Sequence, residues 1–147
     1  METVDRFDCI RQQREPEPLI TLQERSSGNT ITLEAASLLK QYAVSEIDTL
    51  LVLDEDCPFE EQLHLVLARD GRILDHIYIG MMYMSGMFAL IDSGDRWLRF
   101  KFEGDAIWTL RIEAKGRRGL GLLPSVAWRS GGLLSRRYMF LSRGEGE

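Results

Sequence analysis

Histidine is the residue most often used for acid–base chemistry and for binding zinc, and the chain has two, His64 and His76. Asp75 precedes His76, but adjacent residues of a strand point to opposite faces, so these two do not form a dyad. His76 is the candidate general base if the protein is an enzyme, with a carboxylate such as Asp75 or Asp92 nearby. The sequence contains no Gly-x-Ser-x-Gly elbow and no Cys–His spacing typical of zinc. It therefore predicts no metal site and no cofactor, and it favours a protein that is not an enzyme.

The two histidines flank a hairpin signal, because an Asp-Gly pair at 70–71 separates two β-favouring runs. A two-residue loop at this pair places Leu65 opposite His76 and puts His64 on the other face. In that register the two imidazoles cannot share a metal ion. A register shift of one residue would reverse this prediction.

A dense apolar stretch, residues 77–91, contains 15 residues without a charge. It is too short for a membrane-spanning helix, which needs about 20 residues, so we expect no membrane insertion. Its methionines and the tryptophans of the chain are candidates for an apolar ligand pocket inside a curled sheet, although an ordinary core is the simpler interpretation. The pocket candidates are Met82, Met84, Met87, Trp97, Trp108 and Trp128.

Charge is distributed unevenly along the chain. Residues 1–60 have 13 acidic and 5 basic residues, whereas residues 111–147 have 3 acidic and 8 basic residues, in a chain of net charge −5. A basic end of an acidic chain indicates an anionic partner, or contact with the chain's own acidic third. Arginine beside aromatic residues is typical of nucleic-acid grooves, but the overall acidity favours a protein partner over nucleic acid. The candidate anion-binding residues are Arg117, Arg118, Arg136 and Arg137.

The elements that position these residues are predicted from hydrophobic spacing. Leu33, Ala36 and Leu39 recur at helical spacing behind a possible N-cap at Thr32, which predicts one main helix near residues 32–44. The rest of the chain alternates at the period of β-strands. The predicted fold is therefore α+β and β-rich, an antiparallel meander of about seven to nine strands that forms a curled sheet or a partly open barrel.

A second hairpin is predicted from two segments, 97–103 and 108–112, which alternate apolar and charged residues. A three-residue loop between them pairs Phe100 with Leu110. Such a hairpin has one apolar face and one charged face, as expected for a sheet with one side in water.

The predicted organisation is a charged N-terminal arm (1–18), one globular domain (19–142) and a tail (143–147). The first fifteen residues contain no apolar run of signal-peptide length, so we expect a cytoplasmic protein. These features favour a small binding or adaptor protein that engages a partner through the Met/Trp face or the C-terminal arginines. The alternatives are a small enzyme with His76 as base, and an assembly subunit that oligomerises, for example as a homodimer, through a strand edge.

Overall fold

The computed structural model describes residues 1–147 except 56–59, 83–86, 119–122, 125, 131–135 and 145–147, and only the backbone of 60, 61, 81 and 82. All its regular elements are β-strands, and no helix occurs among the described residues. The strands are β1 (Glu2–Thr3), β2 (Phe7–Gln13), β3 (Leu19–Glu24), β4 (Thr30–Leu33), β5 (Ser37–Ala43), β6 (Asp48–Asp54), β7 (Glu60–Arg69), β8 (Arg72–Met82), β9 (Ala89–Gly94), β10 (Trp97–Lys101), β11 (Ile107–Arg117), β12 (Ala127–Arg129) and β13 (Arg137–Gly144).

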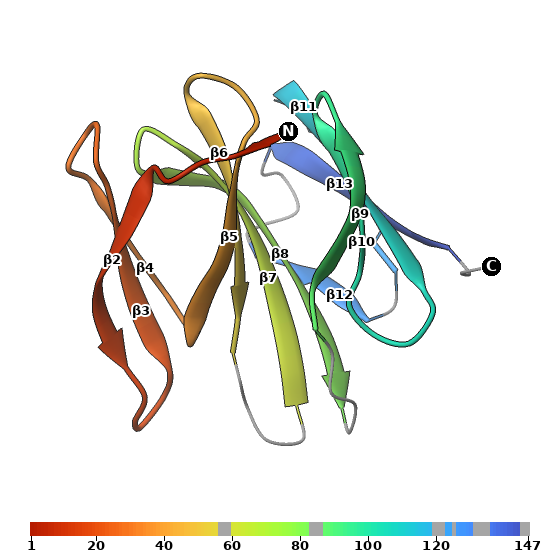
Figure 1. Cartoon of the computed structure of the whole chain (residues 1–147), viewed down its shortest axis with the longest axis horizontal. Helices are drawn as coiled ribbons and strands as arrows, with labels where there is room; N and C mark the ends of the chain where they lie inside the picture. The colour runs from red at the N-terminus through yellow and green to blue at the C-terminus, as the bar shows by residue number, and fades with distance from the viewer. Residues whose placement is uncertain (56–59, 83–86, 119–122, 125, 131–135, 145–147) are drawn as a thin grey trace.

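The strands form three antiparallel sheets arranged as layers (Figure 1). The central sheet A has the order β1-β5-β6-β7-β8-β12. Sheet B, of order β2-β3-β4, lies on one side of it, and sheet C, of order β13-β11-β10-β9, lies on the other. The antiparallel pairing that the sequence predicts is confirmed. The predicted α+β class is wrong, because thirteen strands form three sheets and no barrel closes among the described strands.

The segment 32–44, predicted as the main helix, is extended chain that belongs to β4 and β5. Its apolar residues enter two different cores: Leu33 and Ala35 pack under sheet B, whereas Tyr42 and Val44 pack between sheets A and C. One face of a helix cannot reach both cores. Tertiary packing therefore overrides the helical spacing of this segment, and the helix prediction is wrong.

Strand β6 explains why sheet A is the middle layer. Leu50, Leu51, Val52 and Leu53 are all fully buried. Leu51 and Leu53 pack against sheet B, whereas Leu50 and Val52 pack against sheet C. A continuous apolar run is what a strand covered on both faces requires.

The chain ends take part in the sheets. Within the first 18 residues, β1 pairs with β5 and β2 pairs with β3, and β13 extends to Gly144. The part of the chain that the structure describes holds no helix of the length and apolarity needed to cross a membrane.

Candidate functional site

The two histidines lie on the same face of sheet A. The two-residue loop at 70–71 forms as predicted, with both residues at positive φ. A one-residue bulge at Leu74 then shifts the pairing, so that His76 lies opposite Val66. His64 Nδ1 and His76 Nε2 are 2.8 Å apart. The prediction that the two rings occupy opposite faces is therefore wrong.

The surroundings of the histidine pair make it a poor general base. His64 Nε2 lies 3.4 Å from Glu55 Oε1, and the His64 side chain is only 5% exposed. Burial and, to a smaller extent, the neighbouring His64 together lower the pKa of His76 to about 4, although Asp75 acts in the opposite direction. His76 is thus neutral at pH 7 and holds a proton weakly. The described residues contain no group of three His, Cys, Asp or Glu side chains that could hold a metal ion.

Asp75 lies on the opposite face of β8 from His76 and joins two sheets. Its carboxylate accepts hydrogen bonds from the backbone N–H groups of Tyr138 and Met139, both at 2.9 Å, and it pairs with the guanidinium of Arg129. The side chains of Asp75 and Arg129 are 3% and 5% exposed. Arg129 also donates to the Met139 carbonyl at 2.8 Å. Asp75 therefore anchors β13 to sheet A; only its contact with the His76 N–H links it to the histidine.

The three tryptophans proposed for an apolar pocket lie in three separate places. Trp108 is fully buried in the core between sheets A and C. Trp128, on β12, is 47% exposed and stacks on Tyr78, with 5.8 Å between ring centroids. Trp97 lies on the outer face of sheet C, because Leu98 and Phe100 take the inner positions of β10. Of these three residues, only Trp97 lines a described cavity.

Of the three methionine candidates, the structure describes the side chain of Met87. The side chain of Met82 and the whole of Met84 lie outside the described residues. Met87 is 84% exposed and precedes the edge strand β9, where Leu90 and Ile91 are each 42% exposed. An assembly subunit is an alternative function predicted from the sequence. If two copies paired through the edge of β9, they would meet at exposed apolar residues.

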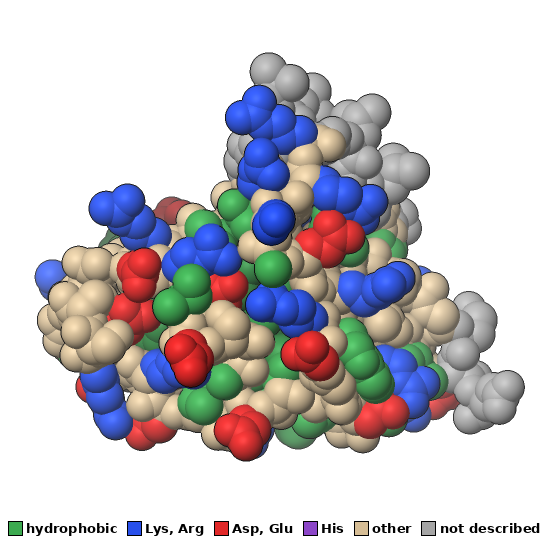
Figure 2. Space-filling view, turned by 90° about the horizontal axis from the view of Figure 1, so that it is seen from above, with side chains coloured by type: hydrophobic (Ala, Val, Ile, Leu, Met, Phe, Trp, Pro, Cys, Tyr) green, Lys and Arg blue, Asp and Glu red, His purple; other side chains and the backbone are tan. Residues whose placement is uncertain are grey.

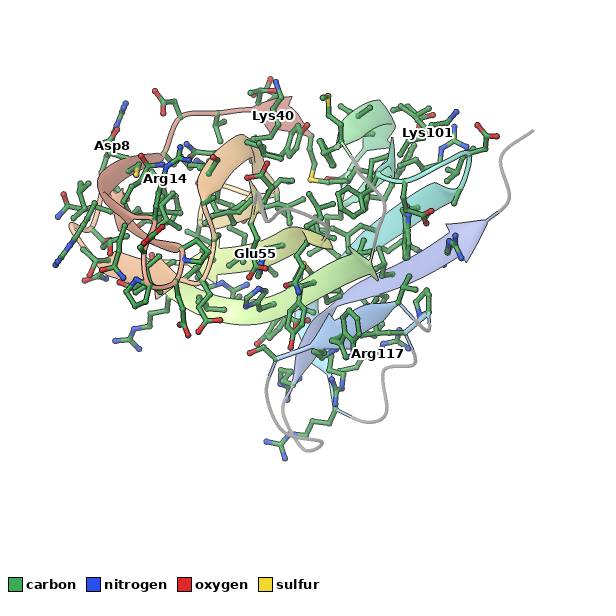
Figure 3. The ribbon with its side chains drawn as sticks, turned by 90° about the horizontal axis from the view of Figure 1, so that it is seen from below. Asp8, Arg14, Lys40, Glu55, Lys101 and Arg117 are labelled. Carbon is green, nitrogen blue, oxygen red and sulfur yellow. The ribbon has the colours of Figure 1, made fainter. Side chains whose placement is uncertain are left out.

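The arginine candidates lie where β11 and β13 project from the molecule. Ile112 pairs with Met139 and Arg117 pairs with Arg137, so residues 113–116 of β11 face a single residue of β13. This large bulge bends the strand away from the sheet. Figure 3 shows Arg117 on the projecting part, and Figure 2 shows Lys and Arg side chains gathered on it.

Within this projection the four candidates differ in exposure. Arg137 is buried, whereas the other three are exposed. Arg136 Nη1 donates to the Lys115 carbonyl at 2.9 Å, and Arg117 Nε lies 3.0 Å from a carboxylate oxygen of Glu113. We call the exposed set the basic protrusion: Lys115, Arg117, Arg118 and Arg136.

A groove of about 450 Å³, the sheet C groove, adjoins the basic protrusion. Arg111 is one of its lining residues and is paired across the sheet with Trp97 of β10 and Phe140 of β13. Arg96 lies in the tight turn before β10. The charged and aromatic lining residues are Asp95, Arg96, Trp97, Arg111, Glu113, Arg117 and Phe140. This lining offers guanidinium groups and flat rings to a ligand.

Comparisons with protein families, with curated proteins and with solved structures find no match. The function is therefore inferred from the residues of the site alone.

Arg96 and Arg111 are not among the residues predicted from the sequence. The alternation does place Arg111 and Trp97 on the same charged face of the second hairpin, so a signal for them exists. The pairing differs from the prediction by two residues, since Phe100 faces Trp108 instead of Leu110. With this shift Trp97 lies directly opposite Arg111. The groove could not be predicted from the sequence because it depends on this register.

Proposed function

We propose that the protein binds an anionic partner, specifically an acidic protein, through the basic protrusion. Its guanidinium groups stand on a part of the molecule that projects from the rest (Figure 2). The side chain of Arg117 is 62% exposed. Exposed arginines can meet carboxylates in pairs of N–H···O bonds, and clustered charge accelerates association with an oppositely charged surface.

The observation that carries the proposal is the separation of charge in space. Residues 1–60, with a net charge of −8, build sheet B and the neighbouring strands of sheet A. A second cavity, of about 320 Å³, lies on that side, and Asp5, Glu24, Glu46 and Asp70 line it together with Arg6 and Arg25. Sheets B and C are on opposite sides of sheet A. The first residues of the chain do reach sheet C, where the Met1 ammonium donates to the Gly94 carbonyl at 3.0 Å, but the strands of the acidic third lie in sheets A and B. The protrusion is thus available to a partner in trans.

Charge reversal in the protrusion tests the proposal. We expect Arg118→Glu to weaken binding of a fluorescent poly-glutamate peptide about tenfold, and the double variant with Arg136→Glu to weaken it further, because repulsion replaces attraction. Fluorescence anisotropy at two salt concentrations measures the affinity. Circular dichroism of each variant reports whether the fold is retained.

The matched control is Arg14→Glu, an exposed arginine that follows β2 on the far side of sheet A. It changes the net charge by the same amount as Arg118→Glu. If the control weakened binding equally, net charge alone would govern the interaction and the proposal would be wrong. Tight binding of a single-stranded oligonucleotide that is lost in Arg118→Glu, without binding of the acidic peptide, would also overturn the assignment of an acidic protein.

A further inference from the structure

We infer that the sheet C groove binds a nucleotide, that is, a phosphate ester carrying a planar base, with the phosphate at Arg96 and Arg111 and the base at Trp97. This site adjoins the basic protrusion and shares Arg117 with it. The experiments proposed above change Arg118 and Arg136. Neither of these two arginines lines the groove.

Arg96 is the first observation that points to a ligand. Its backbone has a φ of 62°, a left-handed conformation that costs free energy for a long side chain and that glycine or asparagine adopts more easily. Its Nη1 atom is buried and has no hydrogen-bond partner among the described residues. The residue as a whole is half-buried and lines the groove, so a phosphate oxygen bound there would be an acceptor for the accessible part of its guanidinium.

Arg111 is the second observation. It is exposed, and its cross-strand partners Trp97 and Phe140 are uncharged. The Glu113 carboxylate in the same groove is paired with Arg117 at 3.0 Å. The lining then holds two further guanidinium groups, Arg96 and Arg111, against one further carboxylate, Asp95. Planar guanidinium groups match the geometry of phosphate oxygens.

The rings explain why the ligand is a nucleotide and not a bare anion. The Trp97 indole packs directly on Gly94, because a Cβ added at Gly94 would come 2.2 Å from Trp97 Nε1. The backbone at Gly94 therefore covers one side of the ring. Arg117 already covers one face of Phe140, with its guanidinium carbon 4.2 Å from the ring centroid. Trp97 is thus the ring left to stack on a base. A cavity of about 450 Å³ also far exceeds the space that one phosphate needs and matches the usual size of small-molecule sites.

Isothermal titration calorimetry with adenosine monophosphate, adenosine and inorganic phosphate tests the inference. We expect the nucleotide to bind at least tenfold more tightly than either fragment. Arg96→Gly should lose this binding while keeping or raising thermal stability, because glycine accepts the positive φ without strain. Trp97→Leu should reduce the affinity for the nucleotide to that for inorganic phosphate. Arg14→Gln, outside the groove, should change nothing.

The possible outcomes separate this inference from the proposed function. Unchanged nucleotide affinity in Arg96→Gly would overturn it, and so would equal affinity for the nucleotide and inorganic phosphate. A single-stranded oligonucleotide, used as a second probe, would support the same site if Trp97→Leu abolished its binding. Loss of poly-glutamate binding in Arg118→Glu with intact nucleotide binding would confirm that the two sites are separate.

Discussion

At the scale of single residues, the histidine pair holds two tilted imidazole rings in contact through their nitrogen atoms. One proton occupies the 2.8 Å line between His64 Nδ1 and His76 Nε2. A second proton on His76 would place a charge in a buried site beside another imidazole, and only Asp75 opposes that effect. His76 therefore resists protonation while the protein is folded.

This resistance makes stability depend on pH. The pKa of His76 falls from an unfolded value of 6.5 to about 4 in the folded protein. Between these values the unfolded state binds more protons, so we expect the free energy of unfolding to decrease as pH falls from about 6.5 to about 4, by about 3 kcal/mol at most. Urea unfolding at several pH values measures this, and His76→Gln should flatten the curve in this window. An unchanged curve in the variant would show that other groups cause the loss.

The buried Asp75–Arg129 pair of sheet A holds β13 of sheet C through hydrogen bonds to the Tyr138 and Met139 backbone. Asp75→Ala would leave the Arg129 charge buried without its carboxylate and three backbone N–H groups without this acceptor, so we expect a loss of about 3–5 kcal/mol. Chemical denaturation measures the loss. The control is Asp92→Ala, which breaks an ion pair with Arg99 whose side chains are both 42% exposed. That change should cost less than about 1 kcal/mol, and equal losses would contradict the argument.

At the scale of elements, two bulges determine the positions of the histidine pair and of the basic protrusion. The single extra residue at Leu74 brings His64 and His76 together, and residues 113–116 bend β11 into the basic protrusion. Gly116 completes the second bulge with a φ of 67°. Without these bulges, the pairing of β8 would not shift at Leu74, and β11 would not bend away from the sheet.

Gly116→Ala tests the second bulge. An added Cβ would lie 2.7 Å from Arg136 Cγ and 3.0 Å from the Arg137 carbonyl oxygen, in addition to the strain of positive φ. We expect a loss of about 2–3 kcal/mol in thermal or urea unfolding. Gly28→Ala is the matched control, because its φ is 75° and nothing lies within 4 Å of the added atom. It should lose only about 1 kcal/mol; losses of similar size would show that crowding at Gly116 is unimportant.

Local chemistry accounts for what the sequence could predict at this scale. The Asp-Gly turn and the two faces of the second hairpin depend on neighbouring residues, and both are confirmed. The bulge at Leu74 depends on packing of whole sheets, and no local pattern signals it. The same is true of the segment 32–44, where apolar residues are shared between two cores. The basic charge of the C-terminal part of the sequence identifies Arg117 as a candidate. Arg96 becomes a candidate only when the structure places its turn beside β11.

At the scale of the whole molecule, layering keeps the two ends of the charge distribution apart. Sheet B is made of one continuous stretch of chain, β2 to β4, and it covers only one face of sheet A. Sheet C covers the other face with later strands. Strands that are early in the chain therefore lie mainly on one side of the molecule, and late strands lie on the other. The acidic and basic parts of the sequence are separated in the same way.

Because charge is separated in this way, the protein has an electric dipole whose positive end is at the basic protrusion. A negatively charged partner exerts a torque on such a dipole before any contact forms, within about 10 Å at an ionic strength of 0.1 M. The molecule would then arrive already rotated, with sheet C leading and sheet B trailing. Encounters would be selected by orientation, so that even a weakly attractive surface meets the same side of the protein each time.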